Sequence, residues 1–243
     1  MKVSIIIPAY NEEKRIESMV KAYSNFFNKK NDILNYELLV VINGTTDNTK
    51  KVIENLQQEM PNLLMQEIKE GGKGLAISYG FKNALERPND LIGFVDADMA
   101  TSPEAFFDLI TNCNFDGVIA SRYMSGSVVT PPRPFIKKWG SKIFFSSLVK
   151  LLFGLNYYDT QCGAKLFTKK VINSIAPHLY VKYWAFDVEI LYLCKRYGFC
   201  IREIPTIWND QAGSKLNTFS EGIPMLTTLI ALRWYYLFQK KAI

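Results

Sequence analysis

The sequence of 243 residues predicts an α/β fold with a mostly parallel sheet that helices cover on both faces. In the first half of the chain, short apolar runs with the length of buried strands alternate with stretches whose apolar residues recur at helical spacing. Such alternation brings successive strands together as parallel neighbours, because each helix crosses back over the sheet.

The expected elements of this half follow one another in order. A strand is expected at each of the apolar runs 3–7, 37–42, 63–68, 91–95 and 118–120. Asn11 can cap the first helix, whose apolar face is Ile16, Met19, Val20, Tyr23 and Phe27. Thr46 or Asp47 can cap the second helix, and the third follows Gly71-Gly72-Lys73-Gly74 and continues to about Glu86.

The second half has a different pattern. We expect a helix over 135–153, an extended element over 158–167, a helix over 185–196, a strand over 200–207 and a polar loop over 209–217. The stretch 223–238 is apolar on nearly every face except at Arg233. We therefore divide the chain into an α/β domain, residues 1–217, and an apolar C-terminal segment, residues 218–243.

Composition narrows the range of partners. The net charge of +6, from 29 Lys and Arg against 23 Asp and Glu, suits an anionic ligand or an anionic membrane surface. The basic residues are dispersed and no recognition motif is present, so no nucleic-acid partner is expected. One histidine and four cysteines without ligand spacing exclude a His or Cys metal site, and we expect free thiols in an intracellular protein. Neither a signal peptide nor a run of about 20 apolar residues that could span a bilayer is expected.

Two carboxylates, Asp96 and Asp98, stand where the apolar run 91–95 ends. Ligands of open α/β sheets bind at the carboxyl ends of the strands. Carboxylates one residue apart can share Mg²⁺ or Mn²⁺ with substrate phosphates. The alternative is that the pair caps the helix that begins near Ser102.

Polar clusters follow the other expected strands at the same kind of position. Singly, each is explained as a turn or a helix cap, but together they predict a nucleotide site at one edge of the sheet. The clusters are Pro8 to Glu12, Asn43 to Thr45, Lys73 between glycines, and Ser121 with Arg122.

The segments IIIPAYNEE, VVINGTTDNT, GGKGLAISYGF and VDADMA, in this order and spacing, resemble the nucleotide-sugar half of family 2 glycosyltransferases with a Rossmann-like GT-A fold. DTQCGAKLF, WAFDVEILYL and GSKL resemble the dolichyl-phosphate β-glucosyltransferase branch, which is close to dolichyl-phosphate mannose synthase. The resemblance covers nearly the whole chain, and its C-terminal motifs are the more specific ones.

The resemblance implies roles for individual residues. On the donor side, the resemblance implies that Pro8, Tyr10 and Glu12 line the base and ribose pocket and that Lys73 approaches the diphosphate or base. It implies that Asp96 serves the ribose side and, with Asp98, the metal. Ser214 and Lys215 would belong to a loop that closes over the donor. The residues implied for an acceptor phosphate are Ser121, Arg122, Arg133, Lys137 and Lys138.

Three positions depart from the family pattern. Asn43 and its neighbours replace an Asp-Asp-Gly-Ser motif, although the amide oxygen of Asn43 can still accept a uracil N–H. Ala100 stands where the mannose synthases carry a Gln, and Asn209 and Asp210 stand where they carry an Arg. The last two differences favour the glucosyl branch.

The implied reaction is a metal-dependent, inverting transfer of a sugar, with glucose expected, from a UDP-sugar to a polyprenyl or dolichyl phosphate. Positive charge from a cation on Asp98, from Lys73 and from Lys215 would stabilise the leaving diphosphate. A lipid phosphate, with a second pKa of about 6, needs no base, whereas a hydroxyl acceptor would need Asp187 or Glu189. Those two carboxylates can equally form an ion-paired helix face. The alternatives are transfer from GDP-mannose, transfer to a glycan hydroxyl, and a binding module without activity.

Two segments, 135–153 and 223–238, combine apolar and aromatic residues with lysines. Interfacial helices on an anionic membrane and amphipathic helices packed on the sheet both explain this composition. Trp234, Tyr235 and Tyr236 close to Lys240 and Lys241 favour the interface. We therefore expect a peripheral protein on the cytoplasmic face of a membrane.

Overall fold

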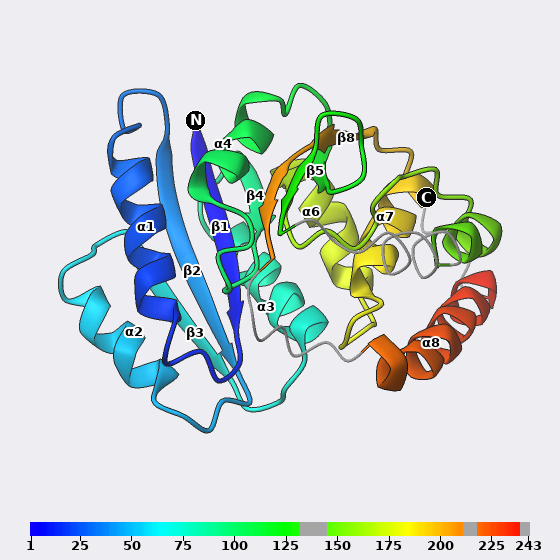
Figure 1. Ribbon diagram of the computed structural model, residues 1–243, viewed down its shortest axis with the longest axis horizontal. Helices are drawn as coiled ribbons and strands as arrows, with labels where there is room; N and C mark the ends of the chain where they lie inside the picture. The colour runs from blue at the N-terminus through cyan, green and yellow to red at the C-terminus, as the bar shows by residue number, and fades with distance from the viewer. Residues whose placement is uncertain (132–144, 211–217, 239–243) are drawn as a thin grey trace.

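The protein is described by a computed structural model that places residues 1–131, 145–210 and 218–238. Within this part of the chain, seven strands form one sheet in the order β3-β2-β1-β4-β7-β5-β8 (Figure 1). β7 runs antiparallel to its neighbours β4 and β5, and the other neighbouring pairs are parallel, which confirms a mostly parallel sheet. The strands are β1 (Lys2–Ala9), β2 (Asn35–Asn43), β3 (Leu63–Ile68), β4 (Leu91–Phe94), β5 (Gly117–Ser121), β7 (Lys165–Thr168) and β8 (Ile201–Pro205).

Helices cover both faces of this sheet, as Figure 1 shows. Alternate residues of β1 serve the two faces, because Ile5 and Ile7 belong to one apolar core and Ile6 to the other. The first core is covered by α1 (Ile16–Asn28), α2 (Thr49–Gln57) and α4 (Pro103–Thr111). The second is covered by α3 (Lys73–Leu85), α6 (Lys169–Ile175) and α7 (Phe186–Arg196).

The remaining elements lie around this sheet and its two layers of helices. β6 (Val128–Thr130) and β9 (Ile207–Asn209) form a small parallel pair, and residues Ala176–His178 form a 3-10 turn. The last helix, α8 (Thr218–Phe238), packs Leu229, Leu232 and Tyr236 into the second core. No helix among the described residues is long and apolar enough to cross a membrane. The four cysteines are free, as the sequence predicts.

The structure contradicts two predictions, one about a helix cap and one about a strand. Asn11 does not cap α1, which begins at Ile16; it has a φ of 54°, and its Oδ1 accepts a hydrogen bond from the amide of Thr46 at 2.9 Å. The predicted strand 200–207 is interrupted at Thr206, so that β8 and β9 belong to different sheets. In both cases tertiary contacts override the local pattern.

Two predicted elements are shorter in the described chain. Residues 145–153 of the expected helix 135–153 are helical, and the earlier part of that range lies outside the described residues. Within the expected extended element 158–167, regular strand begins only at Lys165. The preceding segment is a loop that reaches the carboxyl edge of the sheet, where the candidate site lies.

Candidate active site

Polar side chains gather where the carboxyl ends of β1, β2 and β4 meet. Asp96 and Asp98 follow β4, Asn43 is the last residue of β2, and Lys73 begins α3. An ion pair between Lys73 and Asp96 joins the start of α3 to the end of β4. The structure therefore brings together residues that are far apart in the sequence and that the sequence analysis predicted for the donor side.

Lys73 is an enclosed positive charge. Its ammonium group lies 5.7 Å from the ring centre of Trp184 and 5.6 Å from that of Phe186. Burial lowers the pKa of Lys73, but the negative charges of Asp96 and Asp187 outweigh it and raise the pKa above its ordinary value. Lys73 is therefore charged at neutral pH and oriented by aromatic and acidic neighbours.

The glycine-rich loop before α3 allows two backbone segments to touch. Gly72 has a φ of 142°, and a Cβ on it would lie 2.6 Å from the carbonyl oxygen of Lys182. A Cβ on Gly74 would lie 2.5 Å from the carbonyl oxygen of Val181. The amide of Leu75 donates to the Lys182 carbonyl at 3.1 Å. These close contacts hold the start of α3 against the segment that precedes α7.

Asp98 lies in a tight turn after β4. One of its carboxylate oxygens accepts a hydrogen bond from the amide of Ala100 at 3.0 Å, and Met99 has a φ of 61°. Burial and then the charge of Asp96 raise the pKa of Asp98. The cap of α4 is the side chain of Ser102, so the alternative assignment of the aspartate pair to that cap is wrong.

The chemistry of this aspartate pair fits a divalent cation. Two partly buried carboxylates one residue apart repel each other, and a bound cation would offset that repulsion. Among the described residues, no group of three or more His, Cys, Asp or Glu side chains could hold a metal ion by itself. Mg²⁺ or Mn²⁺ held by Asp96 and Asp98 would therefore take its remaining ligands from substrate phosphates and water.

The end of β1 carries the residues implied for the base and ribose. Pro8 is partly buried within β1, and Tyr10 is 47% exposed. Glu12 is only 8% exposed, and Arg15 binds its carboxylate through two guanidinium nitrogens, one of them at 2.8 Å. Arg15 is absent from the residues predicted from sequence, and its charge partly opposes the rise that burial causes in the pKa of Asp98. It therefore adds a positive charge near the aspartate pair.

The side chain of Asn43 connects three segments of the chain. It is 3% exposed, its Nδ2 donates to the carbonyl of Ala9 at 2.9 Å, and its Oδ1 accepts from the amide of Gly72 at 3.0 Å. The amide oxygen predicted to accept a uracil N–H is thus already a hydrogen-bond acceptor within the fold. Asn43 holds the glycine-rich loop on the ends of β1 and β2.

Glu189, one of the two candidate bases on α7, has a structural role. It is fully buried, and its carboxylate accepts hydrogen bonds from the amides of Tyr180 and Val181, both at 2.9 Å. The hydroxyl of Tyr236 donates to it at 2.8 Å, which fixes α8 on α7. The interpretation of Glu189 as a candidate base is therefore wrong, because every one of these contacts holds structure together.

Asp187, the other candidate, is 3% exposed and forms an ion pair with Lys165 of β7. Lys165 is fully buried and also donates to the carbonyl of Cys162 at 2.6 Å. Burial raises the pKa of Asp187, although the charges of Lys165 and Lys73 oppose this rise. Lys165 is absent from the sequence predictions. The feature that could have indicated it is the presence of a lysine within the otherwise apolar run AKLF.

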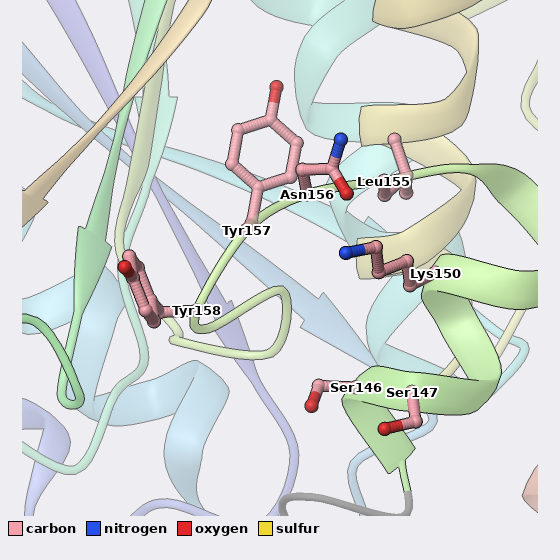
Figure 2. Close-up of a pocket in the computed structure, with 7 residues that line it drawn as sticks. All are labelled: Ser146, Ser147, Lys150, Leu155, Asn156, Tyr157 and Tyr158. Carbon is pink, nitrogen blue, oxygen red and sulfur yellow. The ribbon is translucent and has the colours of Figure 1, made fainter.

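A hollow of about 390 Å³ lies beside the helical residues 145–153 (Figure 2). Figure 2 shows two serines and a lysine on the helix, and the other lining residues on the segment that leads to Asp159. The sequence patterns predict no role for this hollow. Its lining residues are Ser146, Ser147, Lys150, Leu155, Asn156, Tyr157 and Tyr158.

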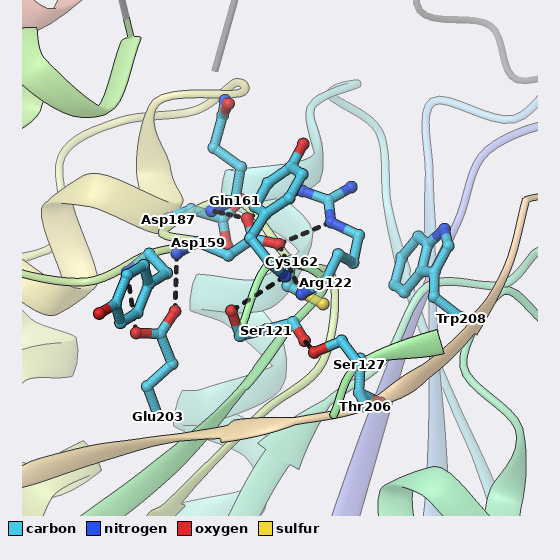
Figure 3. Close-up of polar contacts among 12 residues, drawn as sticks. Ser121, Arg122, Ser127, Asp159, Gln161, Cys162, Asp187, Glu203, Thr206 and Trp208 are labelled. Atoms are coloured by element: carbon cyan, nitrogen blue, oxygen red, sulfur yellow. Dashed lines mark hydrogen bonds and ion pairs between the residues drawn. The ribbon is translucent and has the colours of Figure 1, made fainter. Parts of the chain in front are cut away.

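Arg122 and Asp159 form a two-pronged ion pair at the end of β5 (Figure 3). Two guanidinium nitrogens donate to the two carboxylate oxygens at 2.7 and 2.9 Å, and the backbone amide of Arg122 donates at 3.1 Å. The guanidinium carbon lies 5.0 Å from the ring centre of Trp208. Burial lowers the pKa of Arg122, but the charge of Asp159 raises it well above its ordinary value.

Of the other residues implied for the acceptor phosphate, the structure describes Ser121. Ser121 is fully buried, and its hydroxyl accepts a hydrogen bond from the amide of Tyr123 at 3.3 Å. The residues of the two predicted binding sets that lie outside the described part of the chain are Arg133, Lys137, Lys138, Ser214 and Lys215.

The sheet order and the Asp-x-Asp pair at its carboxyl edge define a Rossmann-like fold of the GT-A type, and solved structures agree. Glucosyl-3-phosphoglycerate synthase from Mycobacterium tuberculosis, in complex with Mn²⁺, UDP and glucosyl-3-phosphoglycerate, superposes with a TM-score of 0.67 at 18% identity. The match covers 95% of this chain and 79% of that one. Its complex with Mn²⁺, UDP-glucose and phosphoglyceric acid gives a TM-score of 0.66 at 17% identity, over 96% and 79% of the two chains.

Sequence comparison gives the family. The model of glycosyl transferase family 2 matches residues 4–175. A dolichyl-phosphate beta-glucosyltransferase of Dictyostelium discoideum is 34% identical over 97% of this chain and 75% of that protein. The human dolichyl-phosphate beta-glucosyltransferase is 30% identical over 97% of this chain and 76% of that protein. The chain belongs to glycosyl transferase family 2 and is a glycosyltransferase.

Proposed function

We propose that the protein transfers glucose from UDP-glucose to dolichyl phosphate or a related polyprenyl phosphate at a membrane surface, with inversion at the sugar carbon. The names of the relatives that match 97% of the chain support this reaction. The observation that carries it is the ion pair of Lys73 with Asp96, next to Asp98, at the carboxyl edge of the sheet. Two carboxylates and an enclosed ammonium group suit the diphosphate of a nucleotide sugar.

On the donor side, Asp98 and Asp96 would hold Mg²⁺ or Mn²⁺. When bound, this cation supplies positive charge that stabilises the leaving diphosphate. Lys73 faces the same region, and its raised pKa keeps it charged beside the negative charge that develops during transfer. We assign the uridine to the end of β1, with Pro8, Tyr10 and Glu12, and the closing loop to Ser214 with Lys215.

On the acceptor side, a phosphate monoester fits better than a hydroxyl. The second pKa of such a phosphate is about 6, so the attacking oxygen is ionised near pH 7 without a base. Asp187 is 3% exposed and paired with Lys165, a setting that favours the orientation of basic groups over the removal of a substrate proton. We assign the phosphate to Arg122, whose guanidinium Asp159 orients through Nε and Nη2, together with Arg133, Lys137 and Lys138, since positively charged donors form strong hydrogen bonds with phosphate.

One face of α8 supports contact with a lipid surface. Its exposed apolar side chains recur at helical spacing, opposite the side chains that pack on the core. Lysines follow this aromatic face in the sequence, as is typical of helices at a membrane interface. We propose that this face lies on the cytoplasmic side of a membrane. The exposed side chains are Ile230, Trp234, Leu237 and Phe238.

Thermal unfolding with nucleotides tests the donor assignment. A ligand that binds the native state raises its apparent stability by mass action, by about 2.7 kcal/mol at a concentration of 100 Kd. We expect UDP with Mn²⁺ to raise Tm more than GDP with Mn²⁺, and EDTA to remove most of the effect. Equal or greater protection by GDP would move the donor to a GDP-sugar, and full protection by UDP in EDTA would contradict the role of the aspartate pair.

A further inference from the structure

The carboxylate of Asp96 is enclosed between two distant segments of the chain. On one side it pairs with Lys73. On the other side lies the backbone of Gly163: a Cβ built there would overlap Oδ2 of Asp96 and lie 2.5 Å from its Cγ and 3.0 Å from its Oδ1. Gly163 belongs to the segment DTQCGAKLF, and its contact is with a carboxylate of the donor site.

Space, and not backbone conformation, requires a glycine at this position. The described glycines with positive φ are at positions 44, 72, 126, 154 and 198, and Gly163 is not among them. The φ of Gly163 therefore lies outside the left-handed region that favours glycine. The volume that its Cβ would need is already filled by the carboxylate of Asp96.

The backbone on both sides of Gly163 is fixed by hydrogen bonds. The carbonyl of Cys162 accepts from the buried ammonium of Lys165 at 2.6 Å. The carbonyl of Ala164 accepts from the amide of Ala120 in β5 at 3.1 Å. Of the two colliding groups, the carboxylate at the end of the Asp96 side chain is therefore the one that can rotate away at low cost.

We propose that Gly163 is a positioning residue of the donor site. Because it has no side chain, it leaves space for the Asp96 carboxylate in the orientation that faces Lys73 and the donor's cation. The inference rests on the proposed function for the identity of the bound group. It extends that function by giving the segment before β7 a role in donor binding. A methyl group at this position would turn the carboxylate away from Lys73 while the apolar cores stay unchanged.

The test is the binding of UDP to purified Gly163→Ala in the presence of Mn²⁺, measured by titration calorimetry. The matched control is Gly80→Ala, because a Cβ on Gly80 would lie 2.6 Å from the side chain of Ile6 in the second core. We expect Gly163→Ala to unfold within about 3 °C of wild type, the range of a ~1 kcal/mol change, and to bind UDP at least about tenfold more weakly. Gly80→Ala should show the reverse, a lowered Tm with an unchanged Kd.

A double variant separates a shared mechanism from two independent losses. Because Gly163 acts through Asp96, the Kd of Gly163→Ala combined with Asp96→Asn should equal that of Asp96→Asn alone. Three results would overturn this inference and leave the proposed function standing. They are additive losses in the double variant, a wild-type Kd in Gly163→Ala, and a Gly163→Ala chain that does not fold. A wild-type chain that does not bind UDP with Mn²⁺ would overturn the proposed function and this inference with it.

Discussion

The ammonium group of Lys165 is fully buried against the carboxylate of Asp187, and this ion pair joins the antiparallel strand β7 to the first turn of α7. Lys73 faces the same carboxylate from the start of α3. A buried ion pair contributes little net stability compared with apolar residues of the same size, but removing one partner leaves an uncompensated charge. The pair therefore links the stability of the fold to the placement of Lys73, which we assign to the donor site.

Replacement of Lys165 by methionine should destabilise the protein strongly. Methionine fills a similar volume but removes the direct ion-pair partner of the buried Asp187 carboxylate, a loss that typically costs about 3–5 kcal/mol. Urea unfolding at pH 7 measures the loss. The control is Lys50→Met, which removes an exposed ion pair with Glu67 and should leave the unfolding midpoint unchanged. Equal midpoints for the two variants would show that the buried pair is dispensable.

The ion pair of Arg122 with Asp159 predicts a specific dependence of stability on pH. Burial raises the pKa of Asp159, but Arg122 outweighs it and holds that pKa below its ordinary value of about 3.9. A carboxylate with a lowered folded-state pKa contributes stability above its unfolded-state pKa and loses it as the pH falls through the folded-state value. The difference in unfolding free energy between wild type and Asp159→Asn should therefore be largest at pH 7 and shrink below about pH 4. A difference that stays constant down to pH 3 would exclude this linkage.

Replacement of Asp98 by asparagine should lower activity through loss of the cation without lowering the stability of the fold. The amide oxygen of asparagine can still accept the hydrogen bond from Ala100, so the turn after β4 should persist. We expect turnover to fall at least about 100-fold, the scale on which one electrostatic contact acts in catalysis, with an unchanged Tm. The measurement is the initial rate as a function of Mn²⁺ concentration, with Asp108→Asn, on the exposed side of α4, as control. Wild-type activity that resists EDTA would remove the basis of the metal assignment.

The exposed face of α8 predicts binding to lipid vesicles. Trp234 and Phe238 are 58% and 78% exposed, and replacing both with serine should weaken binding to vesicles with anionic lipid about tenfold or more. The control is Ile33→Ser, which removes an exposed apolar residue on the loop before β2. Co-sedimentation measures the bound fraction. Equal binding by the two variants would argue that α8 contacts something other than lipid.

Much of the fold can be predicted from sequence because strand and helix alternate locally in the first half. The apolar runs and the polar residues after them specify β1 to β4 and place Asp96, Asp98 and Lys73 at one edge. The direction and position of β7 cannot be read from its few residues, since they depend on pairing with β4 and β5. Lys165 and Gly163 escape prediction for the same reason.

Two of the wrong predictions share one cause. Asn11 and Glu189 are of types that serve as a helix cap and as a catalytic base, yet both are used by contacts with distant segments. Arg15 is not predicted because an arginine in a helical pattern usually lies in solvent, whereas here it binds Glu12. Sequence spacing shows which residues share an element, but long-range hydrogen bonds decide which polar groups are available to a ligand.

The most direct test of the account is transfer of radiolabelled glucose from UDP-glucose, with Mn²⁺, to a short dolichyl phosphate compared with the matching dolichol. Because the phosphate oxygen is already ionised and Asp187 is buried in an ion pair, the account predicts a glucosylated lipid phosphate and no product from the alcohol. Product from dolichol, or from an oligosaccharide hydroxyl at a comparable rate, would contradict it and make Asp187 a general base.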